Sequence, residues 1–245
     1  MNRILPLITN PPVIAYQYQA HNLGVLFTNP NYHNYFYRSY INISYDENNS
    51  CGFNLIDEND ECFDCNYLGY NCDLDIFGYS TESVLDMIKY MINNNYYLRG
   101  LINEFYVPNR IAYNKYDHEH DFLIYGYNDE YQYFNIIGYD HDMFYKETVL
   151  PFENTYNGLF GLHRGWLNFM KIKNDFEFVF DINVMKGFLS DYIYSDNKYG
   201  KKNDELIYGI NIYEYFTDSV KQNVFDLRYL RTFLEHKECM YSRIE

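Results

Sequence analysis

Residues 118–142, which read HEHDFLIYGYNDEYQYFNIIGYDHD, decide how this chain folds. The segment from His120 to Tyr127 is rich in aromatic and β-branched residues, and so is the segment from Tyr131 to about Tyr139. The polar residues 128–130 between them form a turn of hairpin length. The pattern therefore predicts a β-hairpin.

The open end of this hairpin carries two residues that can do chemistry together. His120 enters the first strand and Asp140 leaves the second, so a hairpin with this turn brings them side by side. A carboxylate beside an imidazole fixes its tautomer, and the imidazole can then accept the proton of a nucleophile. We therefore take His120 as a candidate general base and Asp140 as the residue that orients it.

The hairpin belongs to a predicted α+β core that spans residues 1–160. A helix is expected from Ala15 to Phe27, and another begins after Ser80, whose side chain can cap it. Strands are expected at residues 96–105 and 144–150. Together with the hairpin they predict a small antiparallel sheet packed on helices.

Residues 161–245 are expected to extend this core with a strand pair and a helical C-terminal part. The predicted strands are Leu167–Ile172 and Phe176–Asp181, and the predicted helices are residues 181–194, 208–216 and 225–242. The face of the last helix that we expect to be buried consists of Leu227, Leu230, Phe233 and Leu234.

Several segments of the chain carry a resemblance to a known family. They are Asn103–Asn109 (NEFYVPN), His120–Tyr127 (HDFLIYGY), Asp226–Arg228 (DLR) and Glu235–Met240 (EHKECM). In these segments the chain resembles the family of butirosin biosynthesis protein H, which has the fold of papain-like cysteine peptidases. The resemblance implies a central helix on a small antiparallel sheet. It also implies acyl or amide transfer from a carrier-protein thioester in natural-product assembly.

The start of the first helix departs from the family pattern. In papain-like folds a nucleophilic Cys begins the central helix, where the helix dipole favours the thiolate. The resemblance implies a Cys near Tyr18, but the chain has Gln17, Gln19 and His21 around that position, and its first Cys is Cys51. Tyr18 is the candidate substitute, although a phenol with an ordinary pKa near 10 is a poor nucleophile. Gln17, Gln19 and His21 are candidates for binding a substrate carbonyl.

The cysteines do not predict a metal site. Four of them lie close together in the sequence: Cys51, Cys62, Cys65 and Cys72. Only Cys62 and Cys65 form a tight pair, whereas a structural zinc site needs two such pairs. We therefore expect free thiols in a loop-rich lid, no bound metal and no cofactor.

Charge limits the partners that the chain can have. The formal net charge is −15, which argues against nucleic acid and against an anionic membrane surface. An acidic carrier protein would need a local basic patch, for which the candidates are Arg228, Arg231 and Lys237, and separately Lys198, Lys201 and Lys202. The N-terminal residues lack the pattern of a signal peptide, and no apolar run of about 18 residues occurs. We therefore expect a cytoplasmic protein with reduced thiols.

Two hypotheses of function follow. In the first, the chain transfers an acyl or amide group from a carrier-bound thioester to a small-molecule amine, and His120 activates the amine for direct attack. In the second, the chain is a catalytically silent papain-like protein that binds a carrier protein or a product as a scaffold. The missing helix-start Cys favours the second hypothesis and ranks a true peptidase last.

Overall fold

The computed structural model divides into two compact units, each built from two separate stretches of chain. It describes residues 2–48, 52–56, 59–70, 80–161, 166–200, 203–222 and 226–244, without the side chains of residues 59, 60 and 67–70. The first unit comprises residues 1–28 and 62–174, and the second comprises residues 29–61 and 175–245. The expected boundary near residue 160 is therefore displaced, because residues 166–172 belong to the sheet of the first unit.

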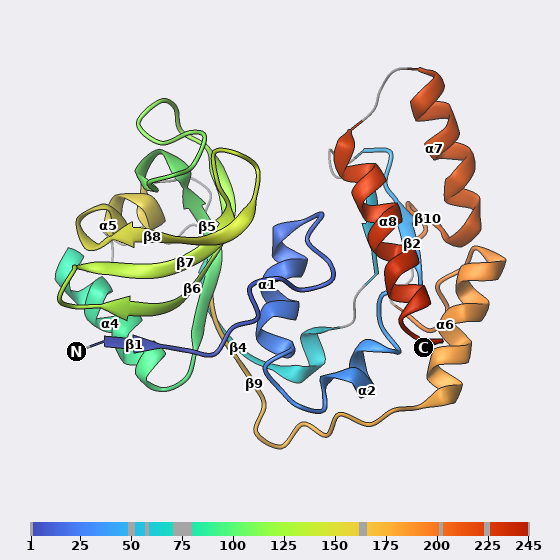
Figure 1. The fold of residues 1–245 in the computed structure, drawn as a ribbon, viewed down its shortest axis with the longest axis horizontal. Coiled ribbons are helices and arrows are strands. Elements are labelled where there is room, and N and C mark those ends of the chain that lie inside the picture. The colour runs from blue at the N-terminus through green and yellow to red at the C-terminus, as the bar shows by residue number, and fades with distance from the viewer. Residues whose placement is uncertain are drawn as a thin grey trace. The chain divides into compact units, whose positions relative to one another are not determined.

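The first unit is an antiparallel sheet with helices on both faces (Figure 1). Its strands are, in sheet order, β4 (Phe63–Tyr70), β9 (Trp166–Ile172), β5 (Tyr97–Asn103), β6 (Glu119–Asn128), β7 (Tyr133–Tyr139) and β8 (Tyr145–Pro151), while β1 (Asn2–Ile4) pairs with β6. Its helices are α1 (Gln17–Leu26), α4 (Thr81–Asn93), α5 (Phe152–Phe160) and the 3-10 turn η2 (Glu104–Tyr106).

Two residues of β5 that point to opposite faces show which helix covers which face of the sheet. The guanidinium of Arg99 donates a hydrogen bond to Asn22 of α1. Ile102 lies on the opposite face, where it packs beside Gly158 of α5. Successive side chains of a strand point to opposite faces, so α1 covers one face and α5 covers the other. Strand β6 is covered on both sides, which explains why residues 122–125 are all buried.

The hairpin predicted at residues 118–142 is present as β6 and β7. Its register pairs Leu123 with Ile137, and a β-bulge lies between Ile124 and Gly126. The loop is longer than predicted, since β7 begins at Tyr133. The side chain of Asn128 explains the loop, because its Oδ1 accepts hydrogen bonds from the backbone N–H groups of residues 130 and 131.

Two other expectations in the first unit have opposite outcomes. Ser80 does cap α4, because its Oγ accepts a hydrogen bond from the N–H of Ser83 at 3.2 Å. The loop-rich lid around the cysteines is wrong in part, because Cys65 lies in strand β4 and pairs with Met170 of β9. Cys62 is buried and Cys65 is partly exposed, while Cys51 and Cys72 lie outside the described residues.

The second unit consists of a three-stranded antiparallel sheet and helices. Its elements are α2 (Tyr32–Phe36), β2 (Ile43–Tyr45), β3 (Phe53–Leu55), the 3-10 turn η1 (Asn59–Cys62), which reaches the start of the first unit, α6 (Ile182–Tyr194), β10 (Ile207–Tyr208), the 3-10 turn η3 (Gly209–Asn211), α7 (Ile212–Lys221) and α8 (Leu227–Tyr241). Residues 176–181 are irregular, so the strand predicted there is wrong. Asp181 caps α6 by accepting from the N–H groups of Asn183 and Val184.

The core of the second unit is aromatic. The ring of Phe53 is fully buried, and its centroid lies 4.5 Å from that of Tyr45, 5.0 Å from that of Tyr229 and 5.2 Å from that of Phe233. These residues come from β2, β3 and α8, so aromatic contacts join the small sheet to the last helix.

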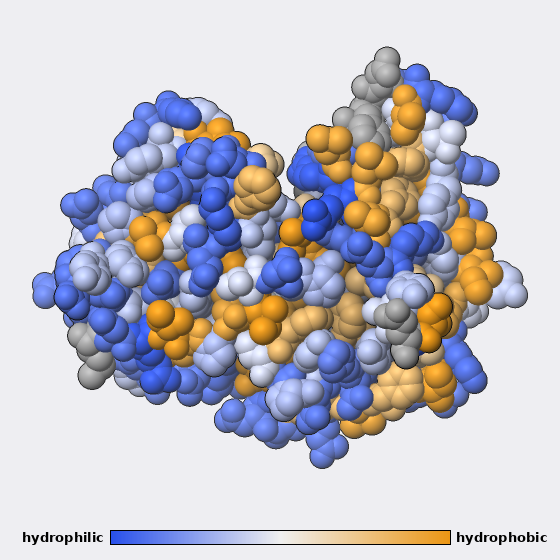
Figure 2. Space-filling view, viewed as in Figure 1, coloured by the Kyte–Doolittle hydropathy of each residue, from blue (hydrophilic) through white to orange (hydrophobic). Residues whose placement is uncertain are grey.

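Helix α8 buries a different face from the predicted one. Phe233 is buried as expected, but Leu227, Leu230 and Leu234 are 76%, 49% and 54% exposed. Apolar residues accordingly reach the surface over α8 (Figure 2). The helix instead buries Glu235 and His236, both 0% exposed.

Glu235 and His236 each have a polar partner, although Nδ1 of His236 has none among the described residues. Glu235 pairs with the guanidinium of Arg231 at 2.7 Å, and the Nε2–H of His236 donates to the carbonyl of Ile41 at 2.7 Å. Burial lowers the pKa of His236 to about 4.

Among the helices that the structure describes, none combines the length and the apolar composition of a membrane span.

The buried imidazole of His236 makes stability depend on pH. Its pKa of about 4 in the folded chain lies below the ordinary value of 6.5, so the unfolded chain binds more protons in that range. The contribution of this group is complete above pH 6.5 and is lost as the pH falls toward 4. We expect it to lower the free energy of unfolding by about 2 kcal/mol between pH 7.5 and 5.

Urea unfolding at the two pH values measures this loss, with His236→Gln as the control. Glutamine can still donate to the carbonyl of Ile41 but does not titrate in this range. The variant should therefore lose about 2 kcal/mol less than the wild type over the same pH change. An identical pH dependence in both proteins would contradict the assignment.

Candidate functional site

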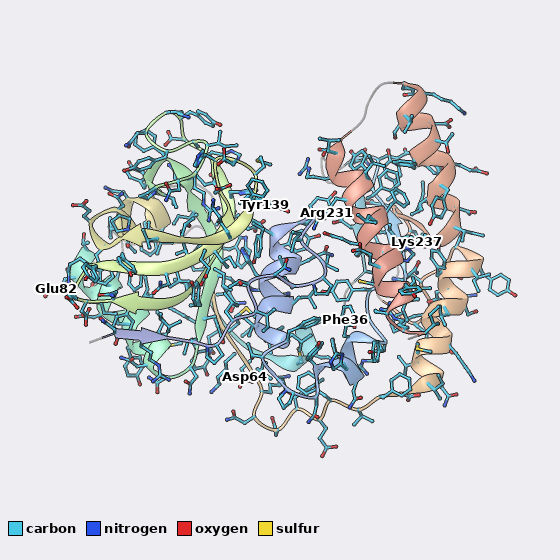
Figure 3. The ribbon with its side chains drawn as sticks, viewed as in Figure 1. Phe36, Asp64, Glu82, Tyr139, Arg231 and Lys237 are labelled. Atoms are coloured by element: carbon cyan, nitrogen blue, oxygen red, sulfur yellow. The ribbon has the colours of Figure 1, made fainter. Side chains whose placement is uncertain are left out.

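The candidate site lies where α1 begins against the ends of β6 and β7. Tyr16 is the N-cap of α1 and makes no side-chain cap hydrogen bond, so Gln17 is the first residue of the helix. Helix α1 contacts β6, β7 and β9. Tyr139, the last residue of β7, lies beside this helix (Figure 3).

The side chain of Gln17 joins all three elements. Its Oε1 accepts a hydrogen bond from the backbone N–H of Tyr139 at 3.0 Å. Its Nε2 donates to the backbone carbonyl of Asp121 and lies 2.8 Å from Nδ1 of His120. Gln17 is 3% exposed. The amide is therefore fully engaged inside the protein, and water does not compete for it.

The contacts of Gln17 favour one tautomer of His120, whereas the carboxylate of Glu104, 3.2 Å from the same Nδ1, favours the other. If the amide of Gln17 were turned over, its oxygen would face the carbonyl of Asp121 and its NH2 group would face the N–H of Tyr139. The Nε2 of Gln17 must therefore point to His120, and it donates its second hydrogen to Nδ1. A neutral His120 then carries its own proton on Nε2. In this arrangement the imidazole presents a donor, not a base, and its side chain is 36% exposed.

The carboxylate beside His120 belongs to Glu104 of η2. Oε1 of Glu104 lies 3.2 Å from Nδ1 of His120 and 3.8 Å from Nε of Arg110. The guanidinium of Arg110 also donates to the carbonyl of Tyr139. Burial lowers the pKa of Arg110, and the charge of Glu104 partly offsets this effect. The Glu104–Arg110 ion pair thus lies behind His120 in a nearly dry environment.

Asp140 does not orient His120, so that expectation needs correction. Its Oδ1 accepts from the backbone N–H groups of Asp142 and Phe144 at 3.0 and 2.9 Å, and its Oδ2 pairs with the ammonium of Lys146. Burial alone would raise the pKa of Asp140, but these partners outweigh it and lower the pKa. The carboxylate is used to close the turn between β7 and β8.

The other residues proposed at the start of α1 differ in their exposure to solvent. Gln19 and His21 are buried at 2% and 1% exposure, so they belong to the interior of the unit. Burial, with a further contribution from the charge of Arg110, lowers the pKa of His21 to about 3, so this imidazole is neutral. Tyr18 is 36% exposed, and the residue of α1 that contacts His120 is Gln17.

Sequence reasoning missed Glu104 and Arg110. Glu104 lies within the segment NEFYVPN, which we quoted only for its resemblance. Its distance of 16 residues from His120 is bridged by the pairing of β5 with β6, in which Asn103 faces Glu119. The sequence signal that could have found it is an acidic residue near the end of the predicted strand that comes just before the His-bearing strand.

The basic residues proposed for a carrier protein are engaged within the chain. Arg228 pairs with Asp226 at 2.6 Å, Lys198 pairs with Asp196 at 2.9 Å, and Lys237 donates to the hydroxyl of Tyr192. Lys201 and Lys202 lie outside the described residues. Arg228 and Lys198 therefore have acidic partners, which weakens the case for electrostatic docking at these two residues.

No protein-family model matches this chain, and no curated protein matches its sequence.

The roles of Glu104 and Asp140 can be separated by replacing each carboxylate with an amide. We expect Glu104→Gln to shift the ring nitrogen signals of His120, because it changes the group 3.2 Å from Nδ1. Asp140→Asn should leave those signals unchanged and lower the free energy of unfolding by about 1–3 kcal/mol, since a buried charged partner of Lys146 is lost. Long-range proton–nitrogen NMR spectra of the imidazole and urea unfolding measure the two effects. A shift in Asp140→Asn alone would restore the original assignment.

Proposed function

We propose that this chain is a papain-like α+β protein that binds an acyl thioester, carried by a carrier protein, without attacking it through a side chain. The observation that carries the proposal is Gln17. It stands at the start of the central helix and contacts His120, where a papain-like enzyme would have its nucleophile. The partner and the pathway come from the resemblance to the butirosin biosynthesis protein H family.

The chemistry of the site favours binding over covalent catalysis. An amide nitrogen is not a nucleophile, and that of Gln17 already donates to Asp121 and His120. The Nε2–H of His120 is free to donate to a carbonyl oxygen, such as that of a thioester. An imidazole in this state can hold and polarise an acyl group, but it cannot accept a proton at Nε2 without changing its tautomer.

A second candidate function is direct aminolysis of the thioester, which the contact between Glu104 and His120 favours. An amine would attack the thioester carbonyl, the carbon–sulfur bond would break, and the thiol of the carrier would leave. The proton lost by the amine would pass to Nε2 of His120 and then to the leaving thiolate. The ring would first have to move its proton from Nε2 to Nδ1, where the N–H donates a hydrogen bond to Glu104. This change breaks the hydrogen bond from Gln17 to Nδ1.

Turnover distinguishes the two candidates. The protein is mixed with an acylated carrier protein and a small-molecule amine, and the amide and free thiol are measured. The binding proposal predicts a complex, seen by NMR titration of the carrier, and no amide above the rate without protein. Amide formation that falls by about 100-fold or more in His120→Ala would replace the proposal with the second candidate.

The papain-like placement of Gln17 can be tested by creating the missing nucleophile. In Gln17→Cys the new thiol would stand at the first turn of α1 and next to His120, both of which favour a thiolate. An ordinary thiol with a pKa near 8.5 is only a few per cent ionised at pH 7. We therefore expect iodoacetamide to alkylate this Cys about 10-fold faster at pH 7 than an ordinary exposed thiol.

The matched control is the double variant Gln17→Cys with His120→Ala. It keeps the helix start but removes the imidazole, so its alkylation should slow toward the ordinary rate. Peptide mapping by mass spectrometry separates the new thiol from the five native cysteines of the chain, and circular dichroism confirms that both variants fold. Equal rates in the single and double variants would mean that residue 17 does not occupy a nucleophile position.

A further inference from the structure

We propose that Glu104, His118 and His120 form a binding site for a divalent transition-metal cation of the zinc type. One ligand atom from each residue can be chosen so that all three lie within 4.8 Å of one another. Two imidazoles and a carboxylate are a donor set that Zn²⁺ prefers in catalytic sites, where a fourth position stays open. This inference does not depend on the proposed carrier binding.

One edge of the site already has the length that a bound metal requires. Zn–N and Zn–O bonds of roughly 2.0–2.1 Å place two ligands of a tetrahedral ion about 3.3 Å apart. Nδ1 of His120 and Oε1 of Glu104 are separated by 3.2 Å. The third ligand comes from His118, whose ring centroid lies 5.4 Å from that of His120. His118 is exposed, so its side chain can rotate toward the pair.

The backbone holds the three residues in register. The N–H of Glu104 donates to the carbonyl of His118 at 2.8 Å. The N–H of His118 in turn donates to the side-chain oxygen of Asn103 at 3.2 Å. His118 directly precedes β6 and His120 is the second residue of that strand. Side chains two residues apart in an extended chain project to the same side. The donors therefore converge because of local structure and not through flexible side chains alone.

The charged residues at the site have opposite effects on cation binding. The carboxylate of Glu104 is buried, at 6% exposure, and Asp117 lies next to the site through its hydrogen bond from Asn103 at 2.7 Å. Arg110 opposes a cation, because its Nε is 3.8 Å from the same carboxylate oxygen. Arg110 already shares Oε1 of Glu104, so a cation must compete with the guanidinium for that oxygen and binds less tightly.

Metal binding must also displace a hydrogen bond. Nδ1 of His120 has one lone pair, which now accepts from Gln17. A cation at Nδ1 takes that lone pair, so the site loses this hydrogen bond, worth about 1 kcal/mol. The ring then keeps its proton on Nε2, so a metal-bound His120 is a donor and cannot act as a base. Zinc should therefore be compatible with the binding proposal and should inhibit direct aminolysis.

The test is zinc titration of the full chain after treatment with EDTA and removal of the chelator. We expect about one equivalent of Zn²⁺ by isothermal titration calorimetry and by elemental analysis after dialysis. Co²⁺ in its place should give the visible absorption of a four-coordinate site. His118→Ala should weaken zinc binding by about 100-fold or more, since losing a ligand costs at least as much as losing a residue that supports one. His118 is exposed, so this variant should fold normally.

Two further variants make the result specific. Glu104→Gln should weaken zinc binding in the same way, with circular dichroism to show that the fold persists. His141→Ala is the matched control, because Asp140, His141 and Asp142 form another group of potential donors. It should bind zinc as the wild type does. Loss of zinc in His141→Ala with retention in His118→Ala would place the site at residues 140–142 and overturn the inference. The absence of stoichiometric zinc would also overturn it. Carrier binding by the EDTA-treated protein tests the proposed function separately.

Discussion

The hydrogen bonds of the Gln17 amide hold together the candidate site of the first unit. The amide connects the start of α1 to the backbone of β6 at Asp121 and of β7 at Tyr139, and it contacts His120 between them. A buried amide is expensive to leave unpaired, so these partners hold one another in place. The contact with Gln17 favours a proton on Nε2 of His120, while the carboxylate of Glu104 near Nδ1 favours the other tautomer. The same hydrogen bonds thus hold the elements together and influence where His120 carries its proton.

The polar side chains of this site form a connected network of ion pairs and hydrogen bonds. Glu104 lies between His120 and Arg110, and Arg110 donates to Tyr139. Such a network restricts each member, because changing one leaves its partners unsatisfied in a region of low dielectric. It also explains why His120 and Asp140 do not pair: Asp140 is already committed to the turn at residues 140–144 and to Lys146.

The second unit follows a different principle. Its last helix buries Glu235 and His236 and exposes three leucines, which reverses the pattern expected of an amphipathic helix. Polar partners reduce the cost of this burial: Glu235 pairs with Arg231, and His236 donates from Nε2 to the carbonyl of Ile41. Phe233 supplies the apolar contact by packing into the aromatic cluster around Phe53. Periodicity alone ranks leucine above histidine as a core residue, so it selected the wrong face.

The sequence by itself determined the local elements. The hairpin of β6 and β7, the helix after Ser80 and the helix after Asp181 were all predicted, because alternation, capping and helical spacing involve residues that are close in the chain. It also determined that α1 begins without a thiol. Only the tertiary structure decided that β9 lies between β4 and β5, that residues 29–61 join the C-terminal helices, and that Glu104 meets His120. These contacts join residues far apart in the chain, and their geometry depends on how the strands pair, which no short pattern encodes.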